Sequence, residues 1–272
     1  MTTVGFIGAG RMGEPMVERM LDAGHSVSVY VRRPEVRERL TARGAVVVDD
    51  PAAAAAGAEV FLSCLFDDKQ LAEVGPSIID ALPGGAVFAS HTTGSVALLR
   101  QLLDRGRRRG VEVVDAPVSG TAEAIRAGKL LVLLGGETAA VQRCAAAVAA
   151  YAEPVQPTGD LGSALAVKLV NNLLFAANMQ LLAEGASLAG ELGVAQDVLY
   201  AALAHASGGS HAAVYASEHG DIQTFGARIS EFLGKDVAAC QAAADELGVR
   251  PDLLFEVVRR GPLPLTPSPI GS

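Results

Sequence analysis

The sequence contains few cysteines and few aromatic residues. The 272 residues contain no Trp, aromatic residues make up only 4%, and the three cysteines are Cys64, Cys144 and Cys240. An odd number of widely spaced cysteines fits neither a disulfide framework nor a metal site, which indicates a reducing cytoplasm and no bound metal. With so few aromatic residues, the core must be built from Ala, Val and Leu, a composition that suits helices packed closely against a sheet.

The sequence also lacks an excess of positive charge. It has 22 basic and 30 acidic residues and a formal net charge of -8, which argues against a nucleic-acid binder. Half of the residues are hydrophobic and only 19% are charged, so the chain is not disordered. We find neither a signal peptide nor an uninterrupted apolar run of about 18 residues, and therefore expect no membrane span.

The first half of the chain alternates short apolar runs with helical segments, and glycines stand where helices would end. This alternation predicts a parallel, doubly wound α/β sheet with helices on both faces. The expected strands are Thr3–Ile7, Val27–Val31, Val60–Cys64, Ala86–Ser90, Val111–Asp115 and Leu130–Leu134. The expected helices include Glu14–Ala23, Pro34–Ala42, Leu71–Asp80 and Val96–Arg109.

Strand patterns largely stop after the turn-rich segment around Pro157. A long Ala- and Leu-rich helix is expected from Ser163 to about Leu192, followed by helices near 195–206, 209–219, 229–247 and 251–260. We therefore predict a nucleotide-binding domain over 1–161 and a smaller all-helical domain over 162–260 that a long interdomain helix joins. The Pro-rich segment 261–272 is expected to be disordered.

A glycine-rich turn follows the first expected strand directly. Gly8-Ala9-Gly10-Arg11-Met12-Gly13 has the spacing G-x-G-x-x-G and opens a helix. Gly8 would allow the tight turn, Gly10 the close approach of a pyrophosphate, and Gly13 the packing of helix on strand. The helix N-terminus would then offer N–H groups to the phosphates. A Rossmann-type dinucleotide site is predicted; the alternative is a glycine-rich turn without a ligand.

The end of the second expected strand bears on the choice of dinucleotide. An NAD site typically has an acidic residue there to bind the ribose 2′-hydroxyl, but this chain has Val31 followed by Arg32 and Arg33. Guanidinium groups suit a 2′-phosphate, so NADP(H) is predicted in preference to NAD(H). The alternative is that both arginines are surface charges at the start of the next helix.

Three polar residues interrupt the long apolar helix: Lys168, Asn171 and Asn172. Lys168 and Asn172 are four residues apart and share a face. An unpaired ammonium in a core is costly, so this face is expected to border a cleft where burial would lower the pKa of the lysine. Equally compatible with the spacing is a lysine that extends to solvent at a domain boundary, with asparagines that cap neighbouring loops.

Four ordered blocks resemble the β-hydroxyacid dehydrogenase family, which includes 3-hydroxyisobutyrate dehydrogenases and glyoxylate/succinic semialdehyde reductases. They are Gly5 to Gly13 continuing to His25, Asp115 to Thr121 continuing to Gly136, Gly162 to Asn172, and Gly234-Lys235-Asp236. Together these blocks span most of the chain.

The resemblance implies a role for individual residues. Lys168 would be the catalytic acid/base and Asn172 would orient the substrate, while Ser119, Gly120 and Thr121 would bind the substrate carboxylate. Leu65, Thr92 and Lys235 would lie beside the cofactor, together with the glycine-rich turn. From the residues alone, Thr92 could instead cap the next helix and Lys235 could be a surface partner of Asp236.

The chain departs from the family pattern at three places. Thr121 stands where the family has a second glycine, His91 replaces a small hydroxyl residue, and the chain ends before the family's usual final segment. The first two departures would narrow or reshape the pocket. The resemblance also implies a homodimer or homotetramer.

The function predicted is hydride transfer between NADP(H) and a small β-hydroxy or semialdehyde acid. Three alternatives have the same layout: an imine reductase, which generally lacks the lysine; a 6-phosphogluconate dehydrogenase, whose helical domain is much larger; and a dinucleotide-binding protein without turnover.

Overall fold

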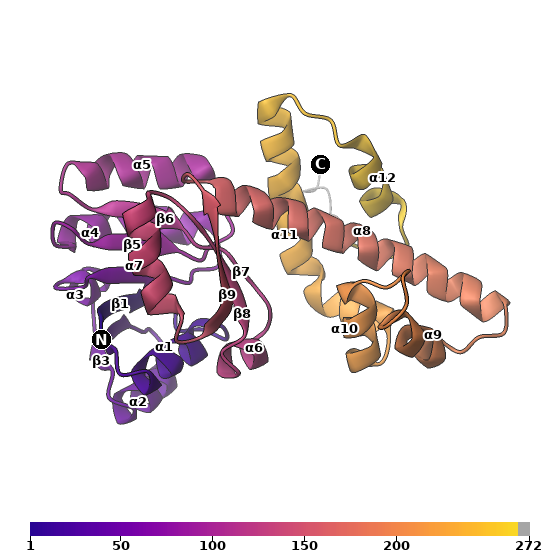
Figure 1. The fold of residues 1–272 in the computed structure, drawn as a ribbon, viewed down its shortest axis with the longest axis horizontal. Helices are drawn as coiled ribbons and strands as arrows, with labels where there is room; N and C mark the ends of the chain where they lie inside the picture. The colour runs from indigo at the N-terminus through magenta and orange to yellow at the C-terminus, as the bar shows by residue number, and fades with distance from the viewer. Residues whose placement is uncertain (266–272) are drawn as a thin grey trace. The chain divides into compact units, whose positions relative to one another are not determined.

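The computed structural model describes residues 1–265, apart from the side chains of residues 231, 232, 246 and 247. The chain divides into an N-terminal unit of residues 1–168 and a C-terminal unit that begins at residue 169 (Figure 1). The predicted boundary between residues 161 and 162 lies slightly earlier, because the start of the long helix packs with the first unit: Leu165 is buried among that unit's side chains.

The N-terminal unit contains one nine-stranded sheet within the described residues. Its strands are β1 (Thr3–Ile7), β2 (Ser26–Tyr30), β3 (Val46–Val48), β4 (Val60–Ser63), β5 (Val87–Ser90), β6 (Glu112–Asp115), β7 (Val118–Ser119), β8 (Leu130–Gly135) and β9 (Ala152–Gly159). The strand order is β3-β2-β1-β4-β5-β6-β8-β7, with β9 paired to β8. All pairs from β3 to β6 are parallel, which confirms the predicted doubly wound architecture.

The far end of this sheet differs from the prediction of a purely parallel sheet. β8 runs antiparallel to both β6 and β7, while β9 is parallel to β8. β9 occupies a segment that the sequence pattern assigned to turns, because it contains Pro154 and Pro157. It pairs with β8 alone, and an edge strand tolerates the missing proline N–H groups.

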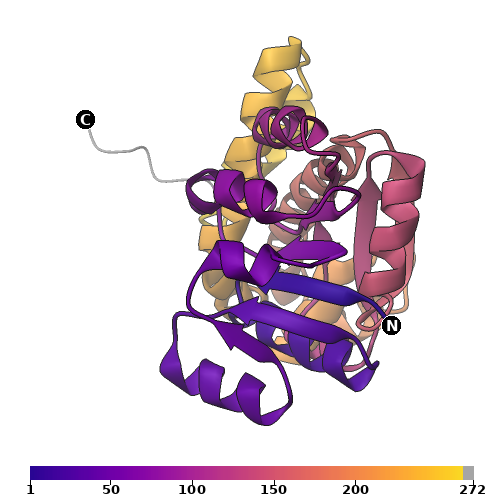
Figure 2. The same cartoon turned by 90° about the vertical axis from the view of Figure 1, so that its left-hand side faces the viewer.

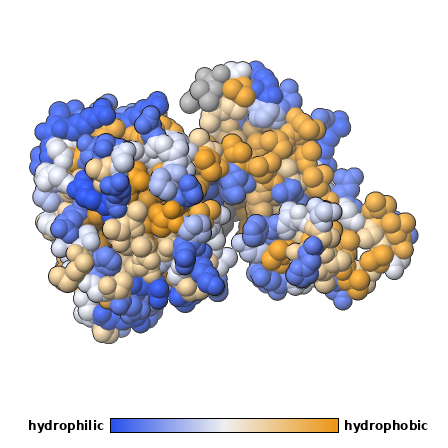
Figure 3. Space-filling model, viewed as in Figure 1, coloured by the Kyte–Doolittle hydropathy of each residue, from blue (hydrophilic) through white to orange (hydrophobic). Residues whose placement is uncertain are grey.

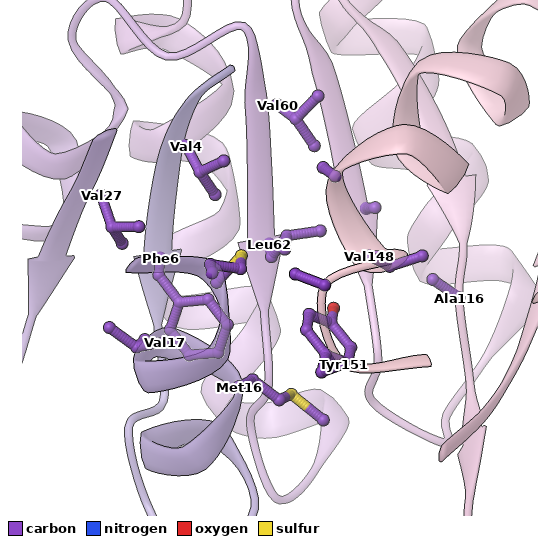
Figure 4. Packing of buried hydrophobic residues seen from close by; sticks show 14 of the residues in the cluster. Val4, Phe6, Met16, Val17, Val27, Val60, Leu62, Ala116, Val148 and Tyr151 are labelled. Carbon is purple, nitrogen blue, oxygen red and sulfur yellow. The ribbon is translucent and has the colours of Figure 1, made fainter. Parts of the chain in front are cut away.

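Alternate residues of each central strand enter two separate cores. On β1, Val4 and Phe6 face one core while Ile7 faces the other; on β4, Leu62 and Phe61 divide in the same way. Figure 4 shows the first core, with Phe6 beside a valine of the first helix. Seen in Figure 2, the strands are stacked with helices at their sides.

Seven helices cover this sheet before the long helix begins, all within the described residues. They are α1 (Gly13–Asp22), α2 (Pro34–Ala42), α3 (Pro51–Ala55), α4 (Asp68–Ala81), α5 (Val96–Arg107), α6 (Ala122–Arg126) and α7 (Thr138–Val148). Side chains of α1, α2 and α7 fill one core and those of α3, α4 and α5 the other. Gly24, Gly44 and Gly110 have positive φ angles of 81°, 95° and 71°, as the prediction that they end helices requires.

The C-terminal unit is helical throughout its described residues. Its elements are the remainder of α8 (Ser163–Glu191), α9 (Gln196–Leu203), α10 (His211–His219), α11 (Ile222–Leu247) and α12 (Asp252–Arg260). Its core is formed by side chains of all five helices; most are aliphatic or small, as the composition predicted, but Tyr200, Phe225 and Phe255 are buried there as well.

Residues 261–265 are ordered and packed, unlike the predicted disordered tail; residues 266–272 lie outside the described residues. Leu263 and Leu265 are 4% and 0% exposed. The side-chain amide of Gln180 donates to the carbonyls of Val258 and Leu263 at 2.9 and 2.8 Å and accepts from the Leu263 N–H at 2.8 Å. Gln180 is 1% exposed, so this buried amide ties the segment to α8.

Helix α8 is long and apolar enough to cross a membrane when judged by length and composition alone. Its mean hydropathy is 1.3 in an 18-residue window, and half of that window is buried inside the protein. The sequence prediction found no such segment, because Lys168, Asn171 and Asn172 interrupt the apolar run. Partial burial is what a core helix also shows, so hydropathy here is weak evidence for a span.

Candidate functional site

The glycine-rich turn has the geometry that the sequence predicted. Gly8 follows β1 with φ +94°, and a Cβ atom there would lie 2.2 Å from the Cys64 carbonyl oxygen. A Cβ atom on Gly13 would lie 2.2 Å from the Gly8 carbonyl oxygen and 2.9 Å from the ring of Phe6. Both positions therefore need glycine for the turn itself and for the packing of α1 on β1.

Gly10 is a different case, because its Cβ atom would meet no atom closer than the Gly8 carbonyl oxygen at 3.9 Å. Packing does not require glycine there, and the open space lies at the start of α1. The residue preceding α1, Met12, makes no side-chain capping hydrogen bond. The first-turn carboxylate of Glu14 is paired with Arg39 at 2.6 and 2.9 Å. The start of α1 is therefore suited to an anionic group such as a phosphate.

A cavity of about 380 Å³ adjoins the turn, within the usual size range of ligand pockets. Its wall is formed by the ends of β1, β2 and β4 and the start of α4. The lining residues are Ile7, Gly8, Ala9, Gly10, Tyr30, Val31, Arg32, Arg33, Pro51, Cys64, Leu65, Phe66, Gln70, Glu73 and Val74. Six of the predicted cofactor residues meet here: Gly8, Ala9, Gly10, Arg32, Arg33 and Leu65.

The two arginines lie where β2 has ended and the chain passes to α2. Arg33 donates to the carbonyl oxygen of Ala9 at 3.2 Å, which brings its guanidinium to the glycine-rich turn. Arg37, which the sequence prediction missed, fixes the end of the strand by donating to the carbonyls of Val31 and Val48 at 3.1 and 3.2 Å. Both arginines are exposed at the start of α2, as the alternative of surface charges expects, and both also line the cavity.

The loops after β4 and β5 are held together by the Thr92 side chain. Thr92 is 3% exposed, and its hydroxyl donates to the Leu65 carbonyl at 3.2 Å. The alternative that Thr92 caps α5 is wrong, because the Ser95 side chain accepts the N–H groups of Ala97 and Leu98. Two predicted cofactor residues are thus adjacent, one of them on the cavity wall.

His91 is buried in the interior and is absent from the wall of this cavity. Its Nδ1 lies 2.5 Å from the Ala116 carbonyl oxygen and its Nε2 lies 2.8 Å from the Tyr151 hydroxyl. Burial lowers the pKa of His91 to about 4, so the ring is neutral at pH 7. The Ala116 carbonyl then accepts from Nδ1–H while Nε2 accepts from Tyr151. His91, which replaces the small hydroxyl residue of the family, therefore forms hydrogen bonds in the core and does not line this cavity.

The predicted substrate segment forms a short strand and the turn after it. Ser119 ends β7, and Gly120 has φ +137°, a conformation that favours glycine. The Thr121 hydroxyl accepts the N–H of Ala124 at 3.3 Å and so caps α6. The Thr121 side chain is therefore used by the helix, whereas the sequence prediction placed it at the substrate carboxylate.

Helix α8 begins against the end of β6. The Asp115 carboxylate, which is fully buried, accepts the N–H groups of Gly162 and Leu165, both at 2.8 Å. Burial raises the pKa of Asp115, against the effect of these hydrogen bonds. Lys168 follows Leu165 by three residues and is half-buried. Sequence analysis gave Asp115 no role, because its partners are 47 and 50 residues away.

The C-terminal unit brings Asn172 together with the late Lys235-Asp236 pair. Asn172 is 6% exposed; its amide donates to Asp236 at 2.6 Å and accepts from Asn171 at 2.9 Å. Lys235 lies 3.8 Å from Asp236. The asparagines therefore do not cap loops, and Asp236 is a partner of Asn172 that only the K-D pair in the sequence could have indicated.

Together these features define a class of protein: one that binds a dinucleotide at the carboxyl edge of a doubly wound sheet. A family model described as the NAD binding domain of 6-phosphogluconate dehydrogenase matches residues 3–162. A second, described as NAD-binding of NADP-dependent 3-hydroxyisobutyrate dehydrogenase, matches residues 162–259.

Individual relatives agree with these matches. An uncharacterized oxidoreductase from Shewanella frigidimarina is 31% identical over 71% of this chain and 68% of its own. The 3-hydroxyisobutyrate dehydrogenase of Pseudomonas aeruginosa is 28% identical over 78% of this chain and 72% of its own. The solved structure of Mycobacterium tuberculosis 3-hydroxyisobutyrate dehydrogenase with L-serine shares the fold, with a TM-score of 0.83 at 24% identity over 95% of this chain and 92% of that one.

The chain belongs to the β-hydroxyacid dehydrogenase family, which confirms the resemblance predicted from its motifs. It is a nicotinamide-dependent oxidoreductase of the 3-hydroxyisobutyrate dehydrogenase type.

Proposed function

We propose that this protein transfers hydride between NADP(H) and a small β-hydroxy acid or the corresponding semialdehyde acid, with Lys168 as the general acid/base. The observation that carries the proposal lies on α8, where the half-buried Lys168 stands one turn before the buried Asn172. Asp236 holds the amide of Asn172 in one orientation. An ammonium and an oriented amide on one helix face suit a substrate hydroxyl or carbonyl oxygen.

In this proposal each residue has one task. As a neutral amine, Lys168 accepts the proton of the substrate hydroxyl; as an ammonium, it returns a proton to the alkoxide in the reverse direction. Asn172 orients the same oxygen, while Ser119 and Gly120 bind the carboxylate through a hydroxyl and a backbone N–H. The nicotinamide, when bound, supplies or accepts the hydride. Proton transfer by a positioned side chain contributes about 10²- to 10⁴-fold in rate.

A screen of aldehydes with the purified protein tests the reaction class. NADPH oxidation is followed with glyoxylate, succinic semialdehyde, methylmalonic semialdehyde and a cyclic imine. We expect turnover of a carboxylate-bearing aldehyde, and loss of about 10²-fold or more in Lys168→Ala with unchanged NADPH affinity. Turnover of the imine alone, or full activity in Lys168→Ala, would contradict the proposal.

The preference for NADP(H) is supported by the cationic edge of the cavity and by the name of the second family model. Arg32 and Arg33 line the cavity, whereas Val31 occupies the position where an acidic residue would bind a free 2′-hydroxyl. Arg32→Ala should raise the Kd for NADPH about 10- to 100-fold, the value of one charge-assisted hydrogen bond, and leave that for NADH unchanged. Arg43→Ala, which removes an exposed arginine paired with Asp22, is the matched control.

A homodimer is proposed on the exposed side of α8. Leu174, Leu181 and Leu188 are seven residues apart and 44%, 55% and 61% exposed, so they lie along one side of the helix. Figure 3 shows a hydrophobic band along the course of α8. An exposed patch of this kind typically marks an interface.

Because the described cysteines Cys64, Cys144 and Cys240 are free thiols, we also propose a cytoplasmic location.

A further inference from the structure

The buried carboxylate of Asp115 accepts hydrogen bonds from backbone N–H groups at the start of α8. Among the described residues, no other side chain is shown to do so. One oxygen accepts the N–H of Gly162, immediately before the helix, and the other accepts the N–H of Leu165. Asp115 is the last residue of β6, a strand paired with β5 and β8. Because β6 is part of the sheet, the carboxylate fixes the start of α8 relative to the sheet.

The local sequence of α8 explains why this distant residue is needed. Helix starts are usually capped by the side chain of the residue just before them, but that residue is Gly162. It has φ +98°, and a Cβ atom there would lie 2.7 Å from the Val96 side chain. A side-chain cap from position 162 is thus excluded by both the backbone conformation and the space available.

The opposite side of the carboxylate is equally constrained. A Cβ atom on Gly135 would lie 2.5 Å from the Asp115 Oδ1 atom and 2.8 Å from the Ser163 Oγ atom. Ser163 itself contacts the Thr158 hydroxyl at 2.7 Å. Glycines on β8 and before α8 therefore leave room for one carboxylate that bridges the sheet and the helix.

We infer that Asp115 is a positioning residue for the reaction: by holding the N–H groups of Gly162 and Leu165, it sets the rotation of the first turns of α8 and so the direction of Lys168. This inference rests on the proposed role of Lys168. Lys168 is three positions after Leu165, within one helical turn, so an error in the rotation of the first turn reaches the amine directly. A displacement of about 1 Å at a reacting group costs about 10²-fold in rate.

The test compares Asp115→Asn with wild type. Asparagine keeps one acceptor oxygen but places an NH₂ group against the second N–H, so one of the two hydrogen bonds is lost. We expect kcat to fall about 10-fold or more, with KM for the aldehyde and the Kd for NADPH within about twofold of wild type. Hydrogen exchange in a peptide covering residues 159–170 should become faster. Glu137→Gln, which alters the capping carboxylate of α7 in the same unit, is the matched control and should leave kcat unchanged.

A merely stabilising role predicts a lower melting temperature with kcat unchanged below the transition, and that result would overturn the inference. Should Asp115→Asn fail to fold, Thr158→Val loosens the same turn through Ser163 while keeping the carboxylate; faster exchange at 159–170 with a wild-type kcat would likewise overturn it. The wild-type protein tests the proposed function separately: if it turns over none of the aldehydes, the proposed function is wrong whatever the Asp115 variant does. In that case the reactivity of the Lys168 amine toward an acylating reagent replaces kcat, and equal labelling in wild type and Asp115→Asn would refute the positioning role.

Discussion

Gly10 and Gly13 belong to one motif but should respond to the same substitution in opposite ways. A Cβ atom on Gly13 would come within 2.2 Å of a backbone oxygen, which can yield only if α1 moves away from β1. A Cβ atom on Gly10 would meet no atom within 3.8 Å, and Gly10 is not among the glycines with positive φ. Alanine therefore strains the fold at position 13 and projects into open space at position 10.

The expected magnitudes follow from these contacts. Gly13→Ala overpacks the junction of helix and strand, at a cost of about 1–3 kcal/mol, or a melting temperature lower by about 2–12 °C. Gly10→Ala should change the free energy of unfolding by less than about 1 kcal/mol, and in the favourable direction where the backbone is compatible. Its methyl group occupies the approach to the N-terminus of α1, so we expect NADPH affinity to fall at least about tenfold, or 1.4 kcal/mol.

Scanning calorimetry without cofactor measures the first effect, and a fluorescence titration with NADPH measures the second. The reasoning requires the two variants to separate: one less stable, the other stable but weak in binding. A Gly10→Ala protein that binds NADPH as wild type does would refute the assignment of the open space at Gly10 to the pyrophosphate. A Gly13→Ala protein as stable as wild type would refute the packing argument.

Three further outcomes are expected. Gln180→Ala removes two hydrogen bonds to Leu263 and one to Val258, and should lower the free energy of unfolding, measured in urea, by about 3 kcal/mol. His91 has a folded pKa of about 4, below its unfolded value of 6.5, so its contribution to stability is present above pH 6.5 and is lost as the pH falls toward 4. This loss amounts to about 3 kcal/mol, and His91→Gln should lack that part of the pH dependence in urea melts. Leu181→Glu with Leu188→Glu should shift the protein from dimer to monomer in analytical ultracentrifugation, whereas an unchanged sedimentation coefficient would contradict the interface on α8.

Much of the sheet could be predicted because its strands are continuous apolar runs separated by glycine-capped helices. The same patterns fail at β9, where Pro154 and Pro157 indicate a turn although an edge strand accommodates them. They fail again at Leu263 and Leu265, which are buried within a Pro-rich segment whose composition indicates disorder. In both cases a tertiary partner, β8 or Gln180, supplies what the local sequence does not show.

In the candidate site, too, residues with a local sequence pattern could be predicted, and residues that depend on distant partners could not. Gly10 and Arg32 could be identified from the sequence because each lies within three residues of a strand end, and the carboxyl ends of parallel strands lie at one edge of a sheet. Leu65 was indicated only by the family resemblance. Asp115 could not, because its partners are far away in the chain and its segment gives no helix signal. A polar residue that ends a buried strand, together with a later helix preceded by glycine, is the one pattern that could have indicated it.

The carboxyl edge of the sheet owes its geometry to side chains that bind distant backbone. Thr92 ties the loop after β5 to Leu65, Asp68 accepts the Ser95 N–H at 2.7 Å, and Asp115 holds the start of α8. Each bond joins segments 27 or more residues apart, so none arises from local propensity. Residues that meet a ligand must leave backbone or charge accessible, and such patterns are visible in a sequence. The residues that position them, of which Thr92 and Asp115 are buried, become recognisable only when the folded chain shows which distant backbone group each one binds.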